Sequence, residues 1–508
     1  MDHWVLTLMV FIPLLGAAVV LCLPSGAKET IRWTATVFTI PPLLLAGWLL
    51  TRFDPGGGFQ FVDRVPWIAA YNIEYFVGVD GLSITMVALT ALLSFRCMIA
   101  SFGIEKALKG YFALFLLLET GMMGTFVALD FFLFYVFWEL MLLPMYFLIG
   151  IWGGPRREYA AIKFFLYTLL GSVLMLVVLI YLYFTPDPHS FDMTKLGALV
   201  ADKIPLRVQL LLWAGLFVGF AIKIPAFPFH TWLPDAHVEA PTAISVILAG
   251  VLLKMGTYGI LRINYGILPA ATLADFWGGH SLAFWLLAAL GTWNIIYGAI
   301  CAMAQTDLKK LVAYSSISHM GYVMLGMAAF TPQGINGAVL QMFNHGTITA
   351  MLFLLVGVIY DRAHHRDIDG FGGLASIMPL YTGVTGFAFF AAMGIPGLSA
   401  FISEVLVLLG SWQVYPVLTV IAASAVILTA GYMLSAFQRM YLGAPNPKYA
   451  DTGWEINGRE LFTLIPLAAI VLFLGIYPKA ILNLQSPRLV EIAERVKAAA
   501  PAAPVANR

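Results

Sequence analysis

Four charged side chains lie inside stretches of the chain that are otherwise hydrocarbon: Glu139, Lys223, Lys254 and Glu404. A charge at the centre of a bilayer costs roughly 2.5–3.5 kcal/mol on insertion scales, so such a residue usually faces a partner, a water-filled cavity or a transport path. Carboxylates and lysine amines can both bind and release protons. We therefore expect these four residues to form a proton relay.

The surrounding composition is that of a membrane protein. Of the 508 residues, 61% are hydrophobic and 11% are charged, and the mean hydropathy is +0.88. These values lie far outside the range of soluble domains. Apolar stretches of about 20 residues recur from end to end, and they predict an all-α polytopic membrane protein with about 14 transmembrane helices. The predicted spans lie near 3–22, 31–51, 81–101, 111–129, 131–152, 161–184, 208–226, 241–262, 282–304, 310–329, 335–360, 376–409, 414–440 and 460–483.

Basic residues in the loops predict the orientation. Loops that follow odd-numbered spans hold most of the lysines and arginines, such as Lys106 and Arg156, whereas the loops after the fourth, tenth and twelfth spans hold none. Cytoplasmic loops carry an excess of positive charge. We therefore expect the loops after odd-numbered spans in the cytoplasm or matrix and both termini on the far side, although the basic residues near 195–207 weaken this pattern.

Prolines interrupt two spans. The seventh runs into KIPAFP at 223–228, and the twelfth contains GIPG at 394–397. Proline removes a backbone donor and clashes with the preceding turn. Matched breaks at membrane depth are typical of inverted repeats around an ion path. We therefore predict two inverted five-helix repeats, spans four to eight and nine to thirteen. The fourth helix of each repeat, which is span seven or span twelve, would be broken. The alternative is that the prolines only kink long helices for packing.

This interpretation divides the chain into four regions. Residues 1–110 would hold the first three spans, residues 111–262 the first repeat and residues 282–440 the second repeat. The last span and a tail would occupy residues 441–508, and the end of the tail, from Glu491, is expected to be a short surface helix that frays into disorder.

The first repeat holds a carboxylate and two lysines. Glu139 has aromatic and aliphatic neighbours on every side, so it must be protonated or paired, while Lys223 lies where the broken helix frees carbonyl groups that could hold its ammonium. Opposite charges about 6 Å apart interact by roughly 2.8 kcal/mol at an effective dielectric near 20. Moving one proton against 100 mV needs about 2.3 kcal/mol. Movement of Glu139 relative to Lys223 could therefore decide whether the lysine keeps its proton; a static ion pair is the alternative.

Histidines could extend the relay, because their ordinary pKa near 6.5 is close to neutral. The candidates are His319 and His345 in the tenth and eleventh spans, and His230 and His237 after the first break. A buried histidine often only hydrogen-bonds its neighbours. The segment around Trp232, between the last two histidines, could instead be an anchor at the membrane interface.

Nothing in the sequence predicts a cofactor in this chain. Cys22, Cys97 and Cys301 lie far apart, without the spacing of an iron–sulfur or zinc site. The glycine runs at 56–58 and 370–373 lack the strand–turn–helix context of a phosphate-binding loop and are expected to be turns.

Three segments resemble the antiporter-like subunits of proton-pumping NADH:quinone oxidoreductase, respiratory complex I. They are FHTWLPDAHVEAPT at 229–242 with ILAGVLLKMG at 247–256, AQTDLKKLVAYSSISHMG at 304–321, and FWELMLLPMY at 137–146. The resemblance covers nearly the whole chain and is weakest at 1–75, 185–205 and the tail. The run PGLSAFISE at 396–404 has glutamate where several relatives have lysine, which resembles the middle antiporter-like subunit of the complex.

The resemblance implies roles for the four charges. Glu139 and Lys223 would pair between the fifth and seventh spans, Lys254 would be the central relay, and Glu404 would exchange protons in the second half. The chain would then be a proton-translocating subunit of the membrane arm, driven by NADH oxidation and quinone reduction elsewhere. NADH, FMN, iron–sulfur clusters and quinone would belong to partner subunits.

The resemblance also implies the surroundings. The partners would be other membrane-arm subunits, including neighbouring antiporter-like subunits, and the lipid bilayer, with no nucleic acid. The location would be an energy-transducing membrane, either a bacterial inner membrane or the mitochondrial inner membrane. Three alternatives stay open: a subunit of a Mrp-type cation/proton antiporter, the equivalent subunit of a membrane-bound hydrogenase or photosynthetic ferredoxin-linked complex, and a scaffold without transport.

Overall fold

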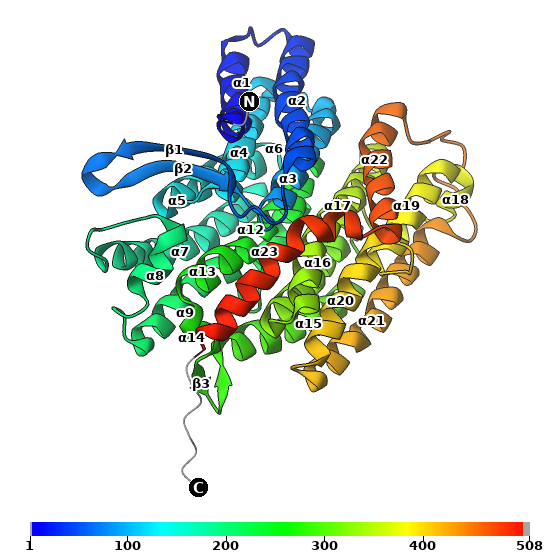
Figure 1. Cartoon of the computed structure of the whole chain (residues 1–508). Helices are drawn as coiled ribbons and strands as arrows, with labels where there is room; N and C mark the ends of the chain where they lie inside the picture. Colours follow the sequence, from blue (N-terminus) through cyan, green and yellow to red (C-terminus); the bar gives the residue numbers. More distant parts are fainter. Residues whose placement is uncertain (1–2, 501–508) are drawn as a thin grey trace.

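The computed structural model describes residues 3–500, and helices make up most of it (Figure 1). Twelve helical segments are long and apolar enough to cross a membrane. Each coincides with one of the predicted spans. They are α1 (Val5–Cys22), α2 (Lys28–Arg52), α3 (Ile84–Ala100), α4 (Leu108–Val127), α5 and α6 (Phe131–Leu140 and Leu142–Trp152), α7 (Arg157–Phe184), α9 (Leu206–Lys223), the helix from α11 to α13 (Thr242–Ile267), the helix that ends in α15 (Ala283–Met303), α17 (Pro332–Ala363), α21 (Pro416–Tyr441) and α22 (Gly458–Ile476).

The two remaining predicted spans are also helical. One is α16 (Leu308–Ala329), which packs against α15 and α17 and is buried along almost its whole length. Because neighbouring helices surround it, α16 can carry polar residues that a lipid-facing helix could not. The other is a broken pair, α19 (Pro379–Ala392) and α20 (Ser399–Trp412). The prediction of an all-α polytopic membrane fold is confirmed.

Both predicted helix breaks are present. The α9 helix ends at Lys223, and eight residues separate it from α10 (Trp232–Glu239). The Trp232 indole donates to the freed carbonyl of Ile222 at 2.8 Å. Trp232 is only 1% exposed, so the alternative of an interfacial anchor is wrong.

The second break depends on glycine. Gly394 and Gly397 have φ angles of +68° and +92°, a region that residues with a Cβ rarely adopt. These glycines let the backbone turn sharply between α19 and α20. The division of the chain into regions at 110, 262 and 440 stays a prediction.

The helix from Thr242 to Ile267 is irregular around the central lysine. Two π-helical turns, Leu248–Leu252 and Ile260–Asn264, flank the α-helical segment α12 (Leu253–Gly259) that holds Lys254. Single π-helical turns occur frequently at functional sites, because they shift side chains out of the regular helical register. The irregularity therefore marks the part of the helix that carries the buried charge.

The structure adds a β-hairpin and several short elements that the sequence analysis did not predict. Strands β1 (Gln60–Ile68) and β2 (Ile73–Val79) form the hairpin, which projects from the helical bundle (Figure 1). The shorter elements are α8 (Met193–Val200), α14 (Pro269–Leu273), the strand pair β3 (Asp275–Trp277) and β4 (His280–Ser281), and α18 (Leu374–Ile377).

The end of the chain differs from the prediction. The last span ends at Ile476 rather than near 483, because Pro478 separates it from a second helix, α23 (Lys479–Ala498). This helix lies across the bundle (Figure 1) and packs against α17, α14 and α13. One face of α23 is buried against the bundle and the other is exposed, so a surface helix is present, but it begins at Lys479 rather than near Glu491 and stays helical to Ala498. Residues 501–508 of the predicted tail lie outside the described residues.

A buried ion cluster fastens α23 to the bundle. Asp80, just before α3, accepts hydrogen bonds from Arg262 at 2.6 and 2.7 Å and from Arg488 of α23 at 2.9 Å. Burial alone would raise the pKa of the Asp80 carboxyl, but the two guanidinium groups hold this pKa well below its usual range. The cluster joins α23 to the same helix that carries Lys254.

Candidate functional site

Lys254 is at the centre of the molecule. Its side chain is fully buried, and its Nζ donates a hydrogen bond to the carbonyl of Ala249. A second hydrogen bond, of 2.6 Å, joins Nζ to Nδ1 of His345 on α17. An ammonium donor and an imidazole acceptor at this distance can pass a proton without movement of either backbone.

His345 leads to a second histidine. The ring of His319 on α16 lies 5.8 Å from the ring of His345, measured between centroids. Nδ1 of His319 lies 3.2 Å from Oε1 of Glu404 on α20. The structure thus brings together Lys254, His345, His319 and Glu404 in one line, from four different helices, and this set is called the inner line below.

Polar neighbours hold Glu404 at the end of the inner line. Gln341 Nε2 lies 3.5 Å from Oε1 of Glu404, and the Ser403 hydroxyl donates to Oε1 of Gln341 at 2.5 Å. A Cβ at position 394 would lie only 2.7 Å from Oε2 of Glu404. The glycine at the break in the helix therefore also makes room for the carboxylate.

The other two residues of the predicted relay, Glu139 and Lys223, are not in direct contact with each other. Lys223 is 2% exposed, and its ammonium lies 4.5 Å from the centre of the Trp138 ring, a cation–π contact. Within residues 3–500, no ion pair joins Lys223 to Glu139, and the contact that holds its ammonium is the one with Trp138. The freed carbonyl of Ile222, which could have held the ammonium, is occupied by Trp232.

Glu139 lies at the outer surface of this chain rather than deep inside. It is partly exposed and lines an apolar depression of about 430 Å³ together with Tyr135, Val136 and Leu143. The four predicted charges are therefore not equivalent: Lys254 and Glu404 belong to the inner line, whereas no hydrogen bond or ion pair among residues 3–500 joins Glu139 or Lys223 to it.

The other two candidate histidines have different surroundings. Nε2 of His230 hydrogen-bonds the Tyr297 hydroxyl at 3.1 Å, which is the ordinary structural role. His237 is fully buried and stacks on Phe353 with 4.5 Å between ring centroids. Neither ring nitrogen of His237 has a hydrogen-bond partner in the part of the chain that the structure describes.

Glu119 and Lys309 are among the buried ionisable groups that the sequence analysis missed, in addition to the Asp80 cluster. Glu119 of α4 is fully buried, and its two carboxyl oxygens have no hydrogen-bond partner among the described residues. Lys309, the second residue of α16, is 4% exposed. Glu119 meets the criterion that identified Glu139, a charge inside an apolar span, so the sequence carried that signal. Lys309 gave none, because a lysine at the start of a helix resembles an ordinary loop residue.

The described residues form no metal site: among them, no group of three or more His, Cys, Asp or Glu side chains could hold an ion. The inner line contains only groups that bind and release protons. A lysine, two histidines and a glutamate placed in this order are suited to exchange protons.

Comparison with known proteins identifies the family of the chain. Residues 128–429 match the family described as NADH:quinone oxidoreductase/Mrp antiporter, transmembrane. The chain is 43% identical to NADH-quinone oxidoreductase subunit M of Rhodobacter capsulatus, with 97% of each protein covered. It is 41% identical to subunit M of Rickettsia conorii, over 95% of this chain and 97% of that protein.

Solved structures show the same fold. A chain of respiratory complex I from Thermus thermophilus matches with a TM-score of 0.86 and 29% identity, over 97% of this chain and 99% of that chain. A chain of the Mrp complex from Dietzia has a TM-score of 0.83 at 22% identity, over 98% and 99%, and shares the fold. The chain belongs to the family of transmembrane subunits shared by NADH:quinone oxidoreductases and Mrp antiporters.

Proposed function

We propose that this chain is a proton-translocating, antiporter-like subunit of the membrane arm of respiratory complex I and that protons pass along the inner line. The observation that carries the proposal is the order of four buried groups: Lys254 hydrogen-bonds His345, the His345 ring lies 5.8 Å from the His319 ring without a hydrogen bond between them, and His319 lies 3.2 Å from Glu404. The identity to subunit M proteins over nearly the whole chain supports the assignment to complex I.

The proposal includes the surroundings of the chain. Its partners are the other membrane-arm subunits, including neighbouring antiporter-like subunits, and the bacterial relatives favour the bacterial inner membrane. NADH, FMN, iron–sulfur clusters and quinone belong to partner subunits, where the redox chemistry releases the energy. This chain supplies the membrane path for protons.

The inner line can work as a series of local transfers. Protonated Lys254 gives a proton to His345, which passes it to His319, and Glu404 exchanges it at the far end. Each of the four groups is nearly or fully buried, so its protonation depends strongly on the charge of its neighbours. Lys223 and Glu139, on the side of the first helix break, supply a charge that biases the line when their separation changes.

The test is NADH-driven proton uptake, measured with NADH:quinone electron transfer, in inverted membrane vesicles. His345→Gln and His319→Gln each remove a member of the line but keep a polar side chain of similar size. His230→Gln is the matched control, because His230 is equally buried but bonds Tyr297 outside the line. Native gels establish that every variant is assembled.

We expect the two line variants to lose proton uptake and electron transfer together, while His230→Gln retains both. Normal uptake in assembled His345→Gln and His319→Gln vesicles would contradict the proposal. Sodium-dependent transport that needs no NADH would instead support the Mrp-type antiporter. The glutamate at position 404 and the identity to subunit M proteins favour complex I.

A further inference from the structure

One buried arginine has no acidic partner. Within residues 3–500, three arginines are at least nine-tenths buried: Arg32, Arg96 and Arg262. Arg32 pairs with Glu105, and Arg262 pairs with Asp80. Arg96 of α3 forms no ion pair with any carboxylate in the same part of the chain. A guanidinium always keeps its charge, and an uncompensated charge inside a membrane protein is costly. Arg96 therefore needs an anion that these residues do not supply.

The guanidinium of Arg96 lies between α3 and α22. Its Nη1 donates to the carbonyl of Phe462 at 2.9 Å, and its Cζ lies 4.5 Å from the centre of the Phe462 ring and 5.5 Å from that of Phe95. Nε is enclosed and has no partner among the described residues. Nη2 makes no hydrogen bond with them either, but it is not enclosed. An anion can therefore reach Nη2.

The side chains around this guanidinium belong to the outer surface of the bundle. Phe462 is 48% exposed, and Ile465, almost one turn further along α22, is 50% exposed. Both α3 and α22 are long and apolar enough to cross the membrane. Exposed apolar side chains on such helices suit contact with hydrocarbon chains. The open edge of the guanidinium thus lies beside a surface that fits a lipid.

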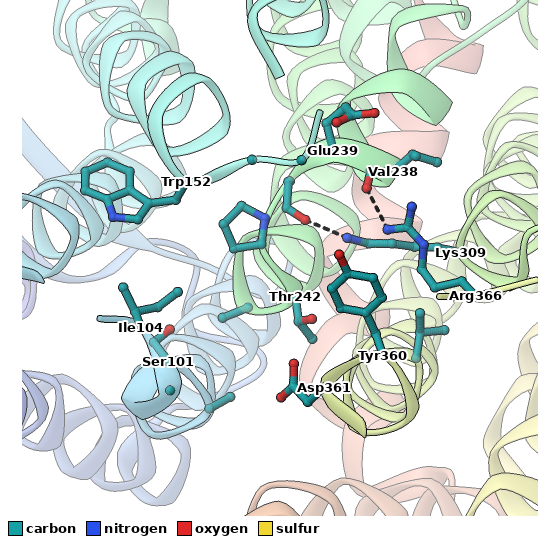
Figure 2. Close-up of a pocket in the computed structure, with 18 of the residues that line it drawn as sticks. Ser101, Ile104, Trp152, Val238, Glu239, Thr242, Lys309, Tyr360, Asp361 and Arg366 are labelled. Atoms are coloured by element: carbon teal, nitrogen blue, oxygen red, sulfur yellow. Dashed lines mark hydrogen bonds between the residues drawn. The ribbon is translucent and has the colours of Figure 1, made fainter. Parts of the chain in front are cut away.

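The end of α3 indicates the level of Arg96 in the membrane. A cavity of about 400 Å³ lies there, and Figure 2 shows Ser101 and Asp361 among the polar residues around it. Arg96 precedes Ser101 by five residues, which is about 7.5 Å along a helix. An arginine side chain can extend most of that distance toward the headgroups. The loops after α3 and before α22 both follow odd-numbered spans, which predicts the cytoplasmic leaflet, where anionic lipids attract basic side chains.

We propose that Arg96 and the surface between α3 and α22 bind one phospholipid of the cytoplasmic leaflet. A phosphate oxygen of the lipid accepts a hydrogen bond from Nη2 of Arg96, and an acyl chain lies along Phe462 and Ile465. Guanidinium and phosphate are complementary in charge and in hydrogen-bond geometry. The phosphate supplies the anion that Arg96 lacks. The inference does not depend on the proton path, because it concerns only the outer surface of the chain.

The test is photo-crosslinking of lipid to the assembled complex in nanodiscs. The probe is phosphatidylglycerol with a diazirine near the start of one acyl chain, and mass spectrometry measures the lipid attached to peptides from α3 and α22. Diacylglycerol with the same diazirine lacks the phosphate, and inorganic phosphate is added to a separate sample as a competitor. Arg96→Gln removes the cation. Arg32→Gln is the matched control, because Arg32 is equally buried but already paired with Glu105.

Below saturation of the probe, we expect Arg96→Gln to reduce labelling of the peptide that contains Phe462 about tenfold or more, because a hydrogen bond to a charged group is lost. Arg32→Gln should keep the wild-type yield. Diacylglycerol should label the wild type as weakly as phosphatidylglycerol labels Arg96→Gln, and inorganic phosphate should not displace the lipid. Native gels measure the assembly of each variant.

Equal labelling of wild type and Arg96→Gln would overturn the proposal, because apolar contact alone would then hold the lipid. Equal labelling of the wild type by diacylglycerol and phosphatidylglycerol would also overturn it, and this comparison decides if Arg96→Gln does not assemble. Loss of labelling on addition of inorganic phosphate would show that the site takes the free ion. Absence of label from both helices in the wild type would show that a neighbouring subunit covers them. Each of the last two outcomes also overturns the proposal.

Discussion

The buried Asp80 cluster should control how firmly α23 is held. Replacing Asp80 by asparagine keeps the shape of the side chain but removes the negative charge that Arg262 and Arg488 share at 2.6 to 2.9 Å. A hydrogen bond to a charged group contributes about 1.5–3 kcal/mol. Local opening of α23 breaks the Arg488 contact, so the variant should open about 10 to 150 times more often.

Limited trypsin digestion of the purified complex measures this opening, because α23 contains Lys479, Arg488, Arg495 and Lys497. When opening is rapid compared with cleavage, the cleavage rate follows the open population. Glu491→Gln is the matched control: it removes the other partner of Arg488, at 2.7 Å, but that carboxylate is 63% exposed. An exposed ion pair contributes only about 0–1 kcal/mol, so the control should change cleavage about fivefold at most.

Equal cleavage of the Asp80→Asn and Glu491→Gln variants would refute this reasoning. The dependence on pH gives a second check. The folded-state pKa of Asp80 is depressed, so its contribution is present above the ordinary pKa near 3.9 and is lost only as the pH falls through the folded value. The difference between wild type and Asp80→Asn should therefore stay constant between about pH 6 and pH 8.

Three further outcomes follow from single side chains. Glu119→Leu should leave stability unchanged or raise it, because it removes a buried carboxyl without a partner among the described residues; a lower temperature of dissociation on native gels would show that a partner exists. Gly394→Ala should slow proton uptake, while the complex keeps its electron-transfer cofactors. The added Cβ would crowd Glu404, and an alanine held at the φ of +68° costs about 1–2 kcal/mol. An unchanged rate would mean that the backbone between α19 and α20 shifts to accommodate the alanine. Burial raises the pKa of Asp130, which caps α5, to about 6, so its stabilising contribution is present below about pH 4 and is lost as the pH rises to about 6. Asp130→Asn should remove this part of the pH dependence, measured as the difference in heat-dissociation temperature from wild type, and an unchanged profile would contradict it.

Local patterns in the sequence were sufficient for several features. Membrane insertion depends on apolar length, so the spans could be predicted. The largest boundary error is at the last one, where Pro478 ends α22 early. Proline and glycine act on their own turns, so the breaks after Lys223 and Ala392 could also be predicted. The hairpin β1–β2 was missed because a two-stranded hairpin outside the membrane leaves a weak pattern in so apolar a chain.

Proximity between distant segments could not be predicted in this way. The sequence identified Lys254 and Glu404 as buried charges and named His319, His345, His230 and His237 together as possible extensions of the relay. Only the packing of α12, α16, α17 and α20 places His319 and His345 between the two charges and leaves His230 beside Tyr297. Asp80 meets partners 182 and 408 residues away. Side-chain chemistry and helix breaks are local properties, and a single sequence therefore determines them. The order of groups along a proton path depends on helix packing over long separations, which only the tertiary structure decides.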